Sequence, residues 1–340
     1  MKFAIIGAGN TGHAVSAYLA AQNADCVLYT RDAAKAEIIN HNGITADGSL
    51  DGTFSLKATA CLSDAVEGCD CIIVMTQANA HRAVAESLKP VLAEGQTIII
   101  FNSNWGALEF VQVLGSDIAA KHLVVAETSA QLFVASSPVP GQVHMSTKAK
   151  VGIAASDSSK TASLIHRFSS FFPQFEPAAS IVETTMSTTN PVIHVPITVF
   201  NIARVENGQH FMFYGEGVSQ AAVNLIVNID KERIAVAKAI GCNINDVLTG
   251  INSFWPQKHD NLFDALTKNE TYLRSVGPKT LNHRYLTEDV PFGIAPIAQI
   301  GRLFGVKTPH TDALLGYLNC ILPAEIVGNK LSFSRDDFCQ

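Results

Sequence analysis

The sequence feature that most constrains the fold is a glycine-rich turn near the N-terminus. A short apolar run, Phe3 to Ile6, leads into Gly7-Ala8-Gly9-Asn10-Thr11-Gly12, and a pattern typical of a helix follows at once. This is G-x-G-x-x-G in its required context of strand, tight turn and helix, where the glycines permit the turn, the approach of a pyrophosphate and close packing. The N–H groups at the helix N-terminus favour phosphate. The pattern predicts a dinucleotide site that contains Gly7, Gly9, Asn10, Thr11 and Gly12.

The end of the second predicted strand bears on which dinucleotide is bound. Thr30 and Arg31 follow Cys26 to Tyr29 at the place where an NAD site usually has an acidic residue for the ribose. A hydroxyl and a guanidinium suit a 2′-phosphate, so we expect NADP(H) in preference to NAD(H). The alternative is that Arg31 stacks on adenine, which either cofactor allows. Asp32 is interpreted as the N-cap of the next helix.

The first half of the chain alternates apolar runs of strand length with helical patterns. This alternation predicts an α/β domain over residues 1–183, with a doubly wound sheet of Rossmann type. Because ligands bind beyond the carboxyl ends of such strands, polar residues that follow strands are candidate site residues. They are Thr76 with Gln77, Asn102 to Asn104, and Glu127 with Thr128. Glu127 is a candidate anchor for a cationic or amino group.

Past the middle of the chain, the segment Asn190-Pro191-Val192-Ile193-His194-Val195-Pro196 marks a change of pattern. Helical patterns take over after it, so residues 184–340 are expected to form a helical domain. The longest helical pattern, 223–240, is expected to turn its charged residues 230–233 toward solvent. His194 lies between two prolines and has an unperturbed pKa of roughly 6.5, so it is a candidate acid or base. A buried structural histidine is the alternative.

Composition excludes several classes of protein. The chain has 340 residues, 47% of them hydrophobic, which is enough for about two globular domains and argues against disorder. A net charge of −6 without a basic run argues against a nucleic-acid partner. The longest apolar runs are too short to span a membrane, and the first reaches glycine too early for a signal peptide, so a cytoplasmic location is expected. The seven irregularly spaced cysteines predict reduced thiols and no metal site.

Taken together, these motifs resemble the opine dehydrogenase family of the octopine/nopaline type. The resemblance is carried by the glycine motif, the Asn190-Pro191-x-x-His194-x-Pro196 segment, Tyr214 with Glu216, and the stretch from Arg284 to Pro291. It spans nearly the whole chain. It implies a Rossmann domain followed by a helical domain related to the C-terminal domain of 6-phosphogluconate dehydrogenase, with the site in the cleft between the two domains. It also implies reductive condensation of a 2-oxo acid with the amino group of an amino acid, with pyruvate as the usual oxo acid.

The same resemblance implies residue roles. His194 and Asp289 would form the catalytic pair, and Arg284 would bind the carboxylate of the oxo acid. Asn190 would lie near the nicotinamide, while Asn104, Glu127 and Thr128 would contact the amino acid. Independently of the family, a carboxylate on one imidazole nitrogen orients the ring and leaves the other nitrogen to protonate the C=O or C=N group that receives hydride.

Two other functions remain open at this point. One is a simpler reductase of the ketopantoate, hydroxyacid or glycerol-phosphate type, although such enzymes commonly use a lysine where His194 stands. The other is an NADP-binding sensor without catalysis. The identities of the amino acid and the oxo acid are left open by the sequence, and a homodimer is the expected assembly.

Overall fold

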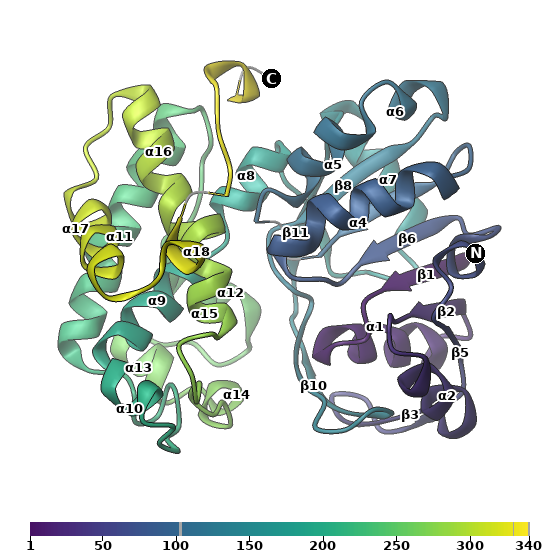
Figure 1. Cartoon of the computed structure of the whole chain (residues 1–340), viewed down its shortest axis with the longest axis horizontal. Helices are drawn as coiled ribbons and strands as arrows, with labels where there is room; N and C mark the ends of the chain where they lie inside the picture. The colour runs from purple at the N-terminus through teal and green to yellow at the C-terminus, as the bar shows by residue number, and fades with distance from the viewer. Residues whose placement is uncertain (102–103, 329, 339–340) are drawn as a thin grey trace. The chain divides into compact units, whose positions relative to one another are not determined.

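The computed structural model describes residues 1–101, 104–328 and 330–338 (Figure 1). The chain forms two compact units, Met1–Thr185 (unit 1) and Met186–Gln340 (unit 2). Unit 1 is an α/β unit built on a large sheet, and unit 2 is helical. Over the described ranges, no helix combines the length and the apolarity that a membrane span requires.

The large sheet of unit 1 has the strand order β12-β11-β8-β7-β6-β1-β2-β5. Its strands are β1 (Lys2–Ile6), β2 (Asp25–Tyr29), β5 (Lys57–Thr59), β6 (Cys71–Val74), β7 (Thr97–Ile100), β8 (Val124–Thr128), β11 (Val151–Ala155) and β12 (Phe175–Pro177). The strands from β5 to β8 are parallel, whereas β11 runs antiparallel to β8. The chain order reverses direction at β1, whose carboxyl end leads into the glycine-rich turn, and this is the doubly wound arrangement expected from the sequence.

Helices cover both faces of this sheet, so successive side chains along each strand enter two different hydrophobic cores in turn. In β1, Phe3 and Ile5 enter one core, and Ala4 and Ile6 enter the other. The helical segments of unit 1 are α1 (Asn10–Ala21), α2 (Ala33–Asn42), α3 (Leu62–Val66), η1 (Ala78–Ala80), α4 (His81–Leu88), η2 (Lys89–Val91), α5 (Gly106–Leu114), α6 (Asp117–Ala120), η3 (Ser158–Lys160), α7 (Thr161–Phe168) and α8 (Ile181–Met186), the last of which reaches into unit 2.

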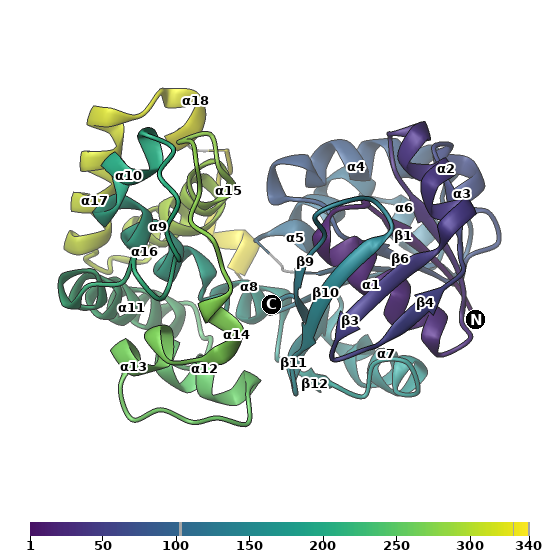
Figure 2. The same ribbon diagram turned by 90° about the horizontal axis from the view of Figure 1, so that it is seen from below.

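A second, smaller sheet packs over α1 (Figure 2). Its order is β4-β3-β10-β9, with β3 (Ile44–Gly48), β4 (Gly52–Phe54), β9 (Phe133–Ser136) and β10 (Gln142–Thr147). Helix α1 contacts β3, β9 and β10 as well as β1 and β2. The helix that follows the glycine-rich turn is therefore held on two sides.

Unit 2 consists of short helices around the long helix α11. They are α9 (Asn190–Phe200), α10 (Ile202–Glu206), α11 (Gln220–Ala239), α12 (Val247–Phe254), α13 (Leu262–Thr267), α14 (Glu270–Leu273), α15 (Arg284–Thr287), the π-helical turn η4 (Val290–Ile294), α16 (Ala295–Phe304), α17 (Pro309–Ile321), α18 (Ala324–Val327) and η5 (Arg335–Phe338). Helix α11 packs against α9, α16 and α17. Its length suits a central role.

The expectation that residues 230–233 face solvent is wrong for three of the four. Lys231 is exposed, but Asp230, Glu232 and Arg233 are buried. Arg233 donates to Asp230 and to the carbonyl oxygens of Met186 and Asn245. Asp230 and Glu232 also accept backbone N–H groups at the starts of α12 and α17. Charged residues in this helix hold neighbouring helix ends, which the periodicity of the sequence does not reveal.

Candidate functional site

The glycine-rich turn of unit 1 has the geometry that a bound dinucleotide requires. Gly7 has φ of +117°, and a Cβ on Gly12 would lie 1.8 Å from the carbonyl oxygen of Gly7, so both glycines are required by the protein itself. Gly9 is different, because a Cβ there would meet no described atom within 4 Å. Its lack of a side chain instead keeps space open at the N-terminus of α1, where no described side chain caps the helix. The turn therefore fits a pyrophosphate.

Hydrogen bonds connect this turn and the start of α1 to the loop between β9 and β10 of the small sheet. The Asn10 side chain accepts the N–H of Ser137, and the ring of His13 links the carbonyl oxygen of Gly9 to the N–H of Gly141. Burial lowers the pKa of His13, in agreement with a neutral ring that donates on one side and accepts on the other. Thr11 is half-buried at the same helix start. The loop after β9 is thus tied to the turn.

Two cations, Arg31 and Lys35, follow β2, one in the connection to α2 and one in the first turn of α2. Arg31 is exposed, and the Oγ1 atom of Thr30 accepts the N–H of Asp32. Asp32 caps α2 by accepting the N–H of Lys35, which confirms its predicted role. The ammonium of Lys35 lies 3.4 Å from the carbonyl oxygen of Ala8 in the glycine-rich turn. Lys35 was not among the predicted residues, because a lysine in the first turn of an exposed helix looks like ordinary surface.

The ends of β6, β7 and β8 carry the remaining predicted residues of unit 1, of which Asn102 and Ser103 lie outside the described residues. The Oγ1 atom of Thr76 is buried and has no hydrogen-bond partner among the described residues, so its hydrogen-bonding capacity is unused in this structure. Asn104 is buried and, with Trp105, has a left-handed backbone, with φ of +48° and +67°. Thr128 donates to the carbonyl oxygen of Ala130. Two successive left-handed residues other than glycine are costly, so neighbouring contacts must hold this turn.

Glu127 supplies those contacts. Its carboxylate accepts hydrogen bonds from the hydroxyls of Thr184 and Thr185, both at 2.6 Å, and from the N–H of Ala107 at 2.9 Å. Thr185 in turn accepts the N–H of Trp105. Burial raises the pKa of Glu127 to about 7, although the hydrogen bonds oppose this shift. With 1% of its surface exposed, Glu127 is placed to hold the 104–107 turn against α8, and this environment favours a positioning role over direct contact with an amino group.

In unit 2, His194 and Asp289 form a buried pair. The Nδ1 atom of His194 lies 2.7 Å from Oδ2 of Asp289, and the two side chains are 4% and 2% exposed. Asn190 begins α9 one turn before His194, so the two side chains share a helix face. Pro191 occupies the first turn of α9, where a missing N–H costs nothing. The structure therefore brings together the two residues that the family resemblance implied as a pair, and their catalytic role stays a prediction.

A close contact between α9 and η4 brings the pair together. A Cβ on Gly293 would lie 2.2 Å from Cγ of Pro191, so only glycine allows the two segments to pack this closely. Asp289 immediately precedes the π-helical turn, a feature that is often found at functional sites. The sequence contained the signal for this contact, since Gly293 stands four residues after Asp289, but its meaning depends on the packing partner.

Aromatic side chains enclose the imidazole of His194. Tyr285 stacks on the ring with centroids 4.1 Å apart, and Phe213 lies edge-on at 5.9 Å. The hydroxyl of Tyr214 lies 3.0 Å from Nε2, the nitrogen that does not face Asp289. Burial raises the pKa of Tyr214 well above its usual value. In the sequence, Tyr214 was part of the family resemblance, which gave it no role.

Arg284 lies beside the same ring cluster. Its guanidinium sits 4.9 Å from the centre of the Tyr285 ring. The salt bridges of unit 2 join other residues, and none joins Arg284 to a described carboxylate. Neighbouring His283 has its pKa lowered to about 4 by burial and by Arg284, so it is neutral near pH 7. Asp289 and Glu288 help to raise the pKa of Arg284, but neither forms a salt bridge with it, so its forked donors suit a ligand carboxylate.

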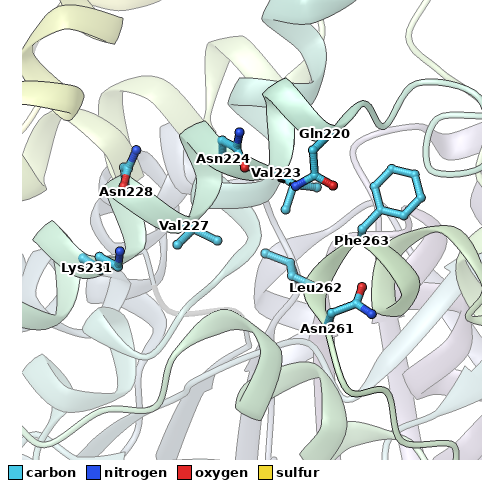
Figure 3. A pocket seen from close by; sticks show the side chains of 9 residues that line it. All are labelled: Gln220, Val223, Asn224, Val227, Asn228, Lys231, Asn261, Leu262 and Phe263. Carbon is cyan, nitrogen blue, oxygen red and sulfur yellow. Dashed lines mark hydrogen bonds between the residues drawn. The ribbon is translucent and has the colours of Figure 1, made fainter.

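A separate hollow of about 560 Å³ lies on α11 and α13 (Figure 3). Gln220, Val223, Asn224, Val227, Asn228, Lys231, Asn261, Leu262 and Phe263 line it. The predicted catalytic residues are not among these lining residues. In the described part of the chain, no cluster of three or more histidine, cysteine, aspartate or glutamate side chains could hold a metal ion.

Comparison with known proteins relates both units to dehydrogenases. Residues 177–321 match the family described as NAD/NADP octopine/nopaline dehydrogenase, alpha-helical domain, and residues 3–158 match ketopantoate reductase PanE/ApbA. The chain is 32% identical to an opine dehydrogenase of Arthrobacter sp. (strain 1C) over 95% of this chain and 91% of that protein. It is 21% identical to a D-nopaline dehydrogenase of Agrobacterium tumefaciens (strain T37) over 93% and 84% of the two chains.

Solved structures agree with this at the level of fold. Octopine dehydrogenase in complex with NADH and agmatine superimposes with a TM-score of 0.76 at 20% identity, over 97% of this chain and 93% of that one. D-mandelate dehydrogenase with NADH and anilino(oxo)acetate gives a TM-score of 0.66 at 17% identity, over 94% and 98%.

Proposed function

The chain belongs to the opine dehydrogenase family, and we propose that it condenses an amino acid with a pyruvate-like 2-oxo acid and reduces the product to an opine. It is an NAD(P)H-dependent oxidoreductase that acts on a CH–NH bond. The observation that carries the proposed substrate chemistry is the grouping, in unit 2, of a buried His194–Asp289 pair with an arginine, Arg284, that forms no salt bridge with a described carboxylate.

In the proposed reaction, Arg284 binds the carboxylate of the oxo acid. A guanidinium offers two parallel N–H donors to a carboxylate, which fixes the orientation of the attached carbonyl group as well as its position. The amino group of the second substrate adds to that carbonyl carbon, and loss of water gives an imine. Apolar rings of Tyr285 and Phe213 around His194 keep competing water away from the reacting carbon.

His194 acts as the proton donor. Asp289 accepts the Nδ1 hydrogen of the ring and stabilises its protonated form, so that Nε2 can donate to the imine nitrogen as its carbon is reduced. The bound nicotinamide supplies the hydride. Asn190 shares a helix face with His194 and is proposed to contact the nicotinamide end of the cofactor.

We propose NADP(H) as the preferred cofactor. Support comes from two cations. Exposed Arg31 directly follows Thr30 at the end of β2, and half-buried Lys35, in the first turn of α2, has its ammonium 3.4 Å from the carbonyl oxygen of Ala8. A 2′-phosphate carries about two negative charges at neutral pH, so each nearby cation favours NADPH over NADH. Gly7, Gly9, Asn10, Thr11, Gly12 and Thr76 are proposed to hold the rest of the dinucleotide.

Asn104 and Thr128 are proposed contacts of the amino acid, with Glu127 acting through the 104–107 turn. A homodimer and a cytoplasmic location stay predictions. The ketopantoate-reductase match of residues 3–158 keeps a simpler reductase as the second candidate. A simpler reductase would need no amine.

The test is amine dependence. Oxidation of NADPH and of NADH is followed with pyruvate alone, with an amino-acid mixture alone, and with both together. Turnover only with both substrates, and its loss in His194→Gln, is the expected result. Turnover with pyruvate alone would establish the simpler reductase. Tight cofactor binding without turnover on any 2-oxo acid would contradict both reactions and favour a sensor.

A further inference from the structure

The hydroxyl of Tyr214 forms a hydrogen bond with Nε2 of His194, the nitrogen that does not face Asp289. It lies 3.0 Å from Nε2, while Asp289 holds Nδ1 at 2.7 Å, so both nitrogens are engaged in the plane of the ring. Tyr285 stacks on the face of the same ring. Tyr214 is itself held by stacking on Tyr272, with centroids 4.8 Å apart and planes 24° apart. The hydroxyl is therefore fixed relative to the imidazole.

The hydrogens in this chain of bonds can be assigned. An ionised Asp289 is only an acceptor, so the Nδ1 atom of His194 carries a hydrogen. In the neutral ring Nε2 is then an acceptor, and Tyr214 must donate to it. Tyr214 can do so because burial keeps its phenol protonated. When the ring takes up a second proton, the same hydroxyl oxygen accepts the hydrogen of Nε2.

We propose that Tyr214 is a positioning residue that acts through His194, in the reaction proposed above. It holds Nε2 in one direction in both protonation states of the ring. Asp289 alone would leave the ring free to pivot about the Nδ1 bond within its stack on Tyr285. With Tyr214 in place, Nε2 keeps this direction until the imine nitrogen replaces the hydroxyl as the acceptor of the Nε2 hydrogen.

The alternative is that Tyr214 merely fills space and satisfies a buried nitrogen. The two roles differ in what they do to the ring. A hydrogen bond from a protonated, charged imidazole to a hydroxyl is about twice as strong as one between neutral groups. If Tyr214 acts through His194, its hydroxyl therefore favours the protonated ring, and removing the hydroxyl moves the ring's titration to lower pH. A space-filling role predicts no such movement.

The test compares Tyr214→Phe with Tyr272→Phe in the full chain. Both substitutions remove one hydroxyl from the same aromatic stack, but only Tyr214 bonds to His194. We expect kcat to fall about tenfold to a hundredfold in Tyr214→Phe, with a smaller change in KM, and to stay near wild type in Tyr272→Phe. NADPH affinity, which residues of unit 1 are proposed to supply, should be unchanged in both.

The second measurement needs no turnover. The ring protons of His194 are followed by NMR against pH and assigned by their absence in His194→Gln. Among the described residues, other titratable or charged groups near this ring include Asp289, His283, Arg284 and Tyr285, and the substitution leaves these four in place. A titration midpoint that moves to lower pH in Tyr214→Phe, and stays put in Tyr272→Phe, is expected.

Two results would overturn the assignment. One is a Tyr214→Phe enzyme with wild-type kcat. The other is a fall in kcat with an unmoved titration of His194, which would mean a packing role. A wild-type enzyme that shows no turnover with any amine would instead overturn the proposed reaction, and the NMR titration would still decide whether Tyr214 sets the state of the ring.

Discussion

Nδ1 of His194 lies 2.7 Å from Oδ2 of Asp289, although the two residues are 95 positions apart in the chain. The pair is buried, and the contact of Pro191 with Gly293 holds the two segments that carry it. A buried carboxylate beside an imidazole is expensive unless both are used or fully bonded. Here the second imidazole nitrogen is hydrogen-bonded to Tyr214, so Asp289, His194 and Tyr214 form one hydrogen-bonded network.

Replacing Asp289 by asparagine tests this hydrogen-bonded network directly. The asparagine side chain would keep the size of the carboxylate but lose the charge that stabilises the protonated ring, and its amide could hold the wrong tautomer of His194. We expect kcat to fall by about a hundredfold or more, the range typical of general acid catalysis. Steady-state kinetics measure this loss, and NADPH binding followed by fluorescence serves as the control. An Asp289→Asn enzyme with near-normal kcat would contradict the proposed role of the pair.

Arg284→Lys should separate binding from chemistry. Lysine keeps the positive charge but loses the forked donors, so the oxo acid would be held less well. We expect KM for the oxo acid to rise about tenfold, with a smaller effect on KM for the amine. Arg302→Lys is the matched control, because Arg302 is an exposed arginine of the same unit that pairs with Asp312. An equal rise in KM for both substrates would argue against a specific carboxylate contact.

The cofactor preference depends on Arg31 and Lys35. Arg31→Ala and Lys35→Ala should each weaken NADPH binding by about tenfold, and leave NADH binding nearly unchanged, because only NADPH carries the 2′-phosphate. Direct titration of each cofactor, monitored by fluorescence, gives both dissociation constants without turnover. Lys57→Ala, at an exposed residue of β5, is the control. Equal losses for NADPH and NADH would mean that the cations contact a part shared by both cofactors.

The glycine motif and the alternation of the first half were sufficient to predict the doubly wound sheet, and the helical patterns of the second half predicted the helical unit. The His194–Asp289 pairing came from the family resemblance, and the structure places the two side chains in contact. The sequence could not show which polar residues form hydrogen bonds within the protein and which remain for a ligand. Glu127 looked like a ligand contact because it ends a strand, yet its partners Thr184 and Thr185 lie 57 and 58 residues further along the chain. Tertiary contacts of this kind leave no local pattern.

Glu127 should give unit 1 a measurable pH dependence. Its pKa is raised to about 7 in the folded protein, from 4.5 in the unfolded chain, so the folded state binds more protons between these values. Stability is therefore greatest below the unfolded pKa and falls as pH rises through about 7. A tenfold difference in proton affinity between the folded and unfolded states corresponds to about 1.4 kcal/mol of stability. Glu127→Gln removes this titration. Between pH 4.5 and about pH 7, the Tm of the variant should therefore decline less than the Tm of the wild type.

This comparison uses the difference between two proteins, which cancels the titration of all other groups. Thermal unfolding followed by circular dichroism at several pH values provides it. Parallel curves for wild type and Glu127→Gln would show that the carboxylate keeps its charge throughout, held by the two threonine hydroxyls and the N–H of Ala107.

Gly293→Ala should disturb the site without touching any reacting group. The new Cβ would lie 2.2 Å from Cγ of Pro191, too close for any real contact, so η4 and α9 must move apart. Asp289 precedes η4 directly, so its distance from His194 should grow. We expect kcat to fall at least tenfold and stability to drop by about 1–3 kcal/mol from overpacking.

Gly316→Ala in α17 is the control, because a Cβ there meets no described atom within 4 Å. That change should leave kcat unaltered and stabilise the helix by up to about 1 kcal/mol. If Gly293→Ala lowered Tm but kept the wild-type kcat, the α9–η4 contact would matter for folding and not for the geometry of the pair.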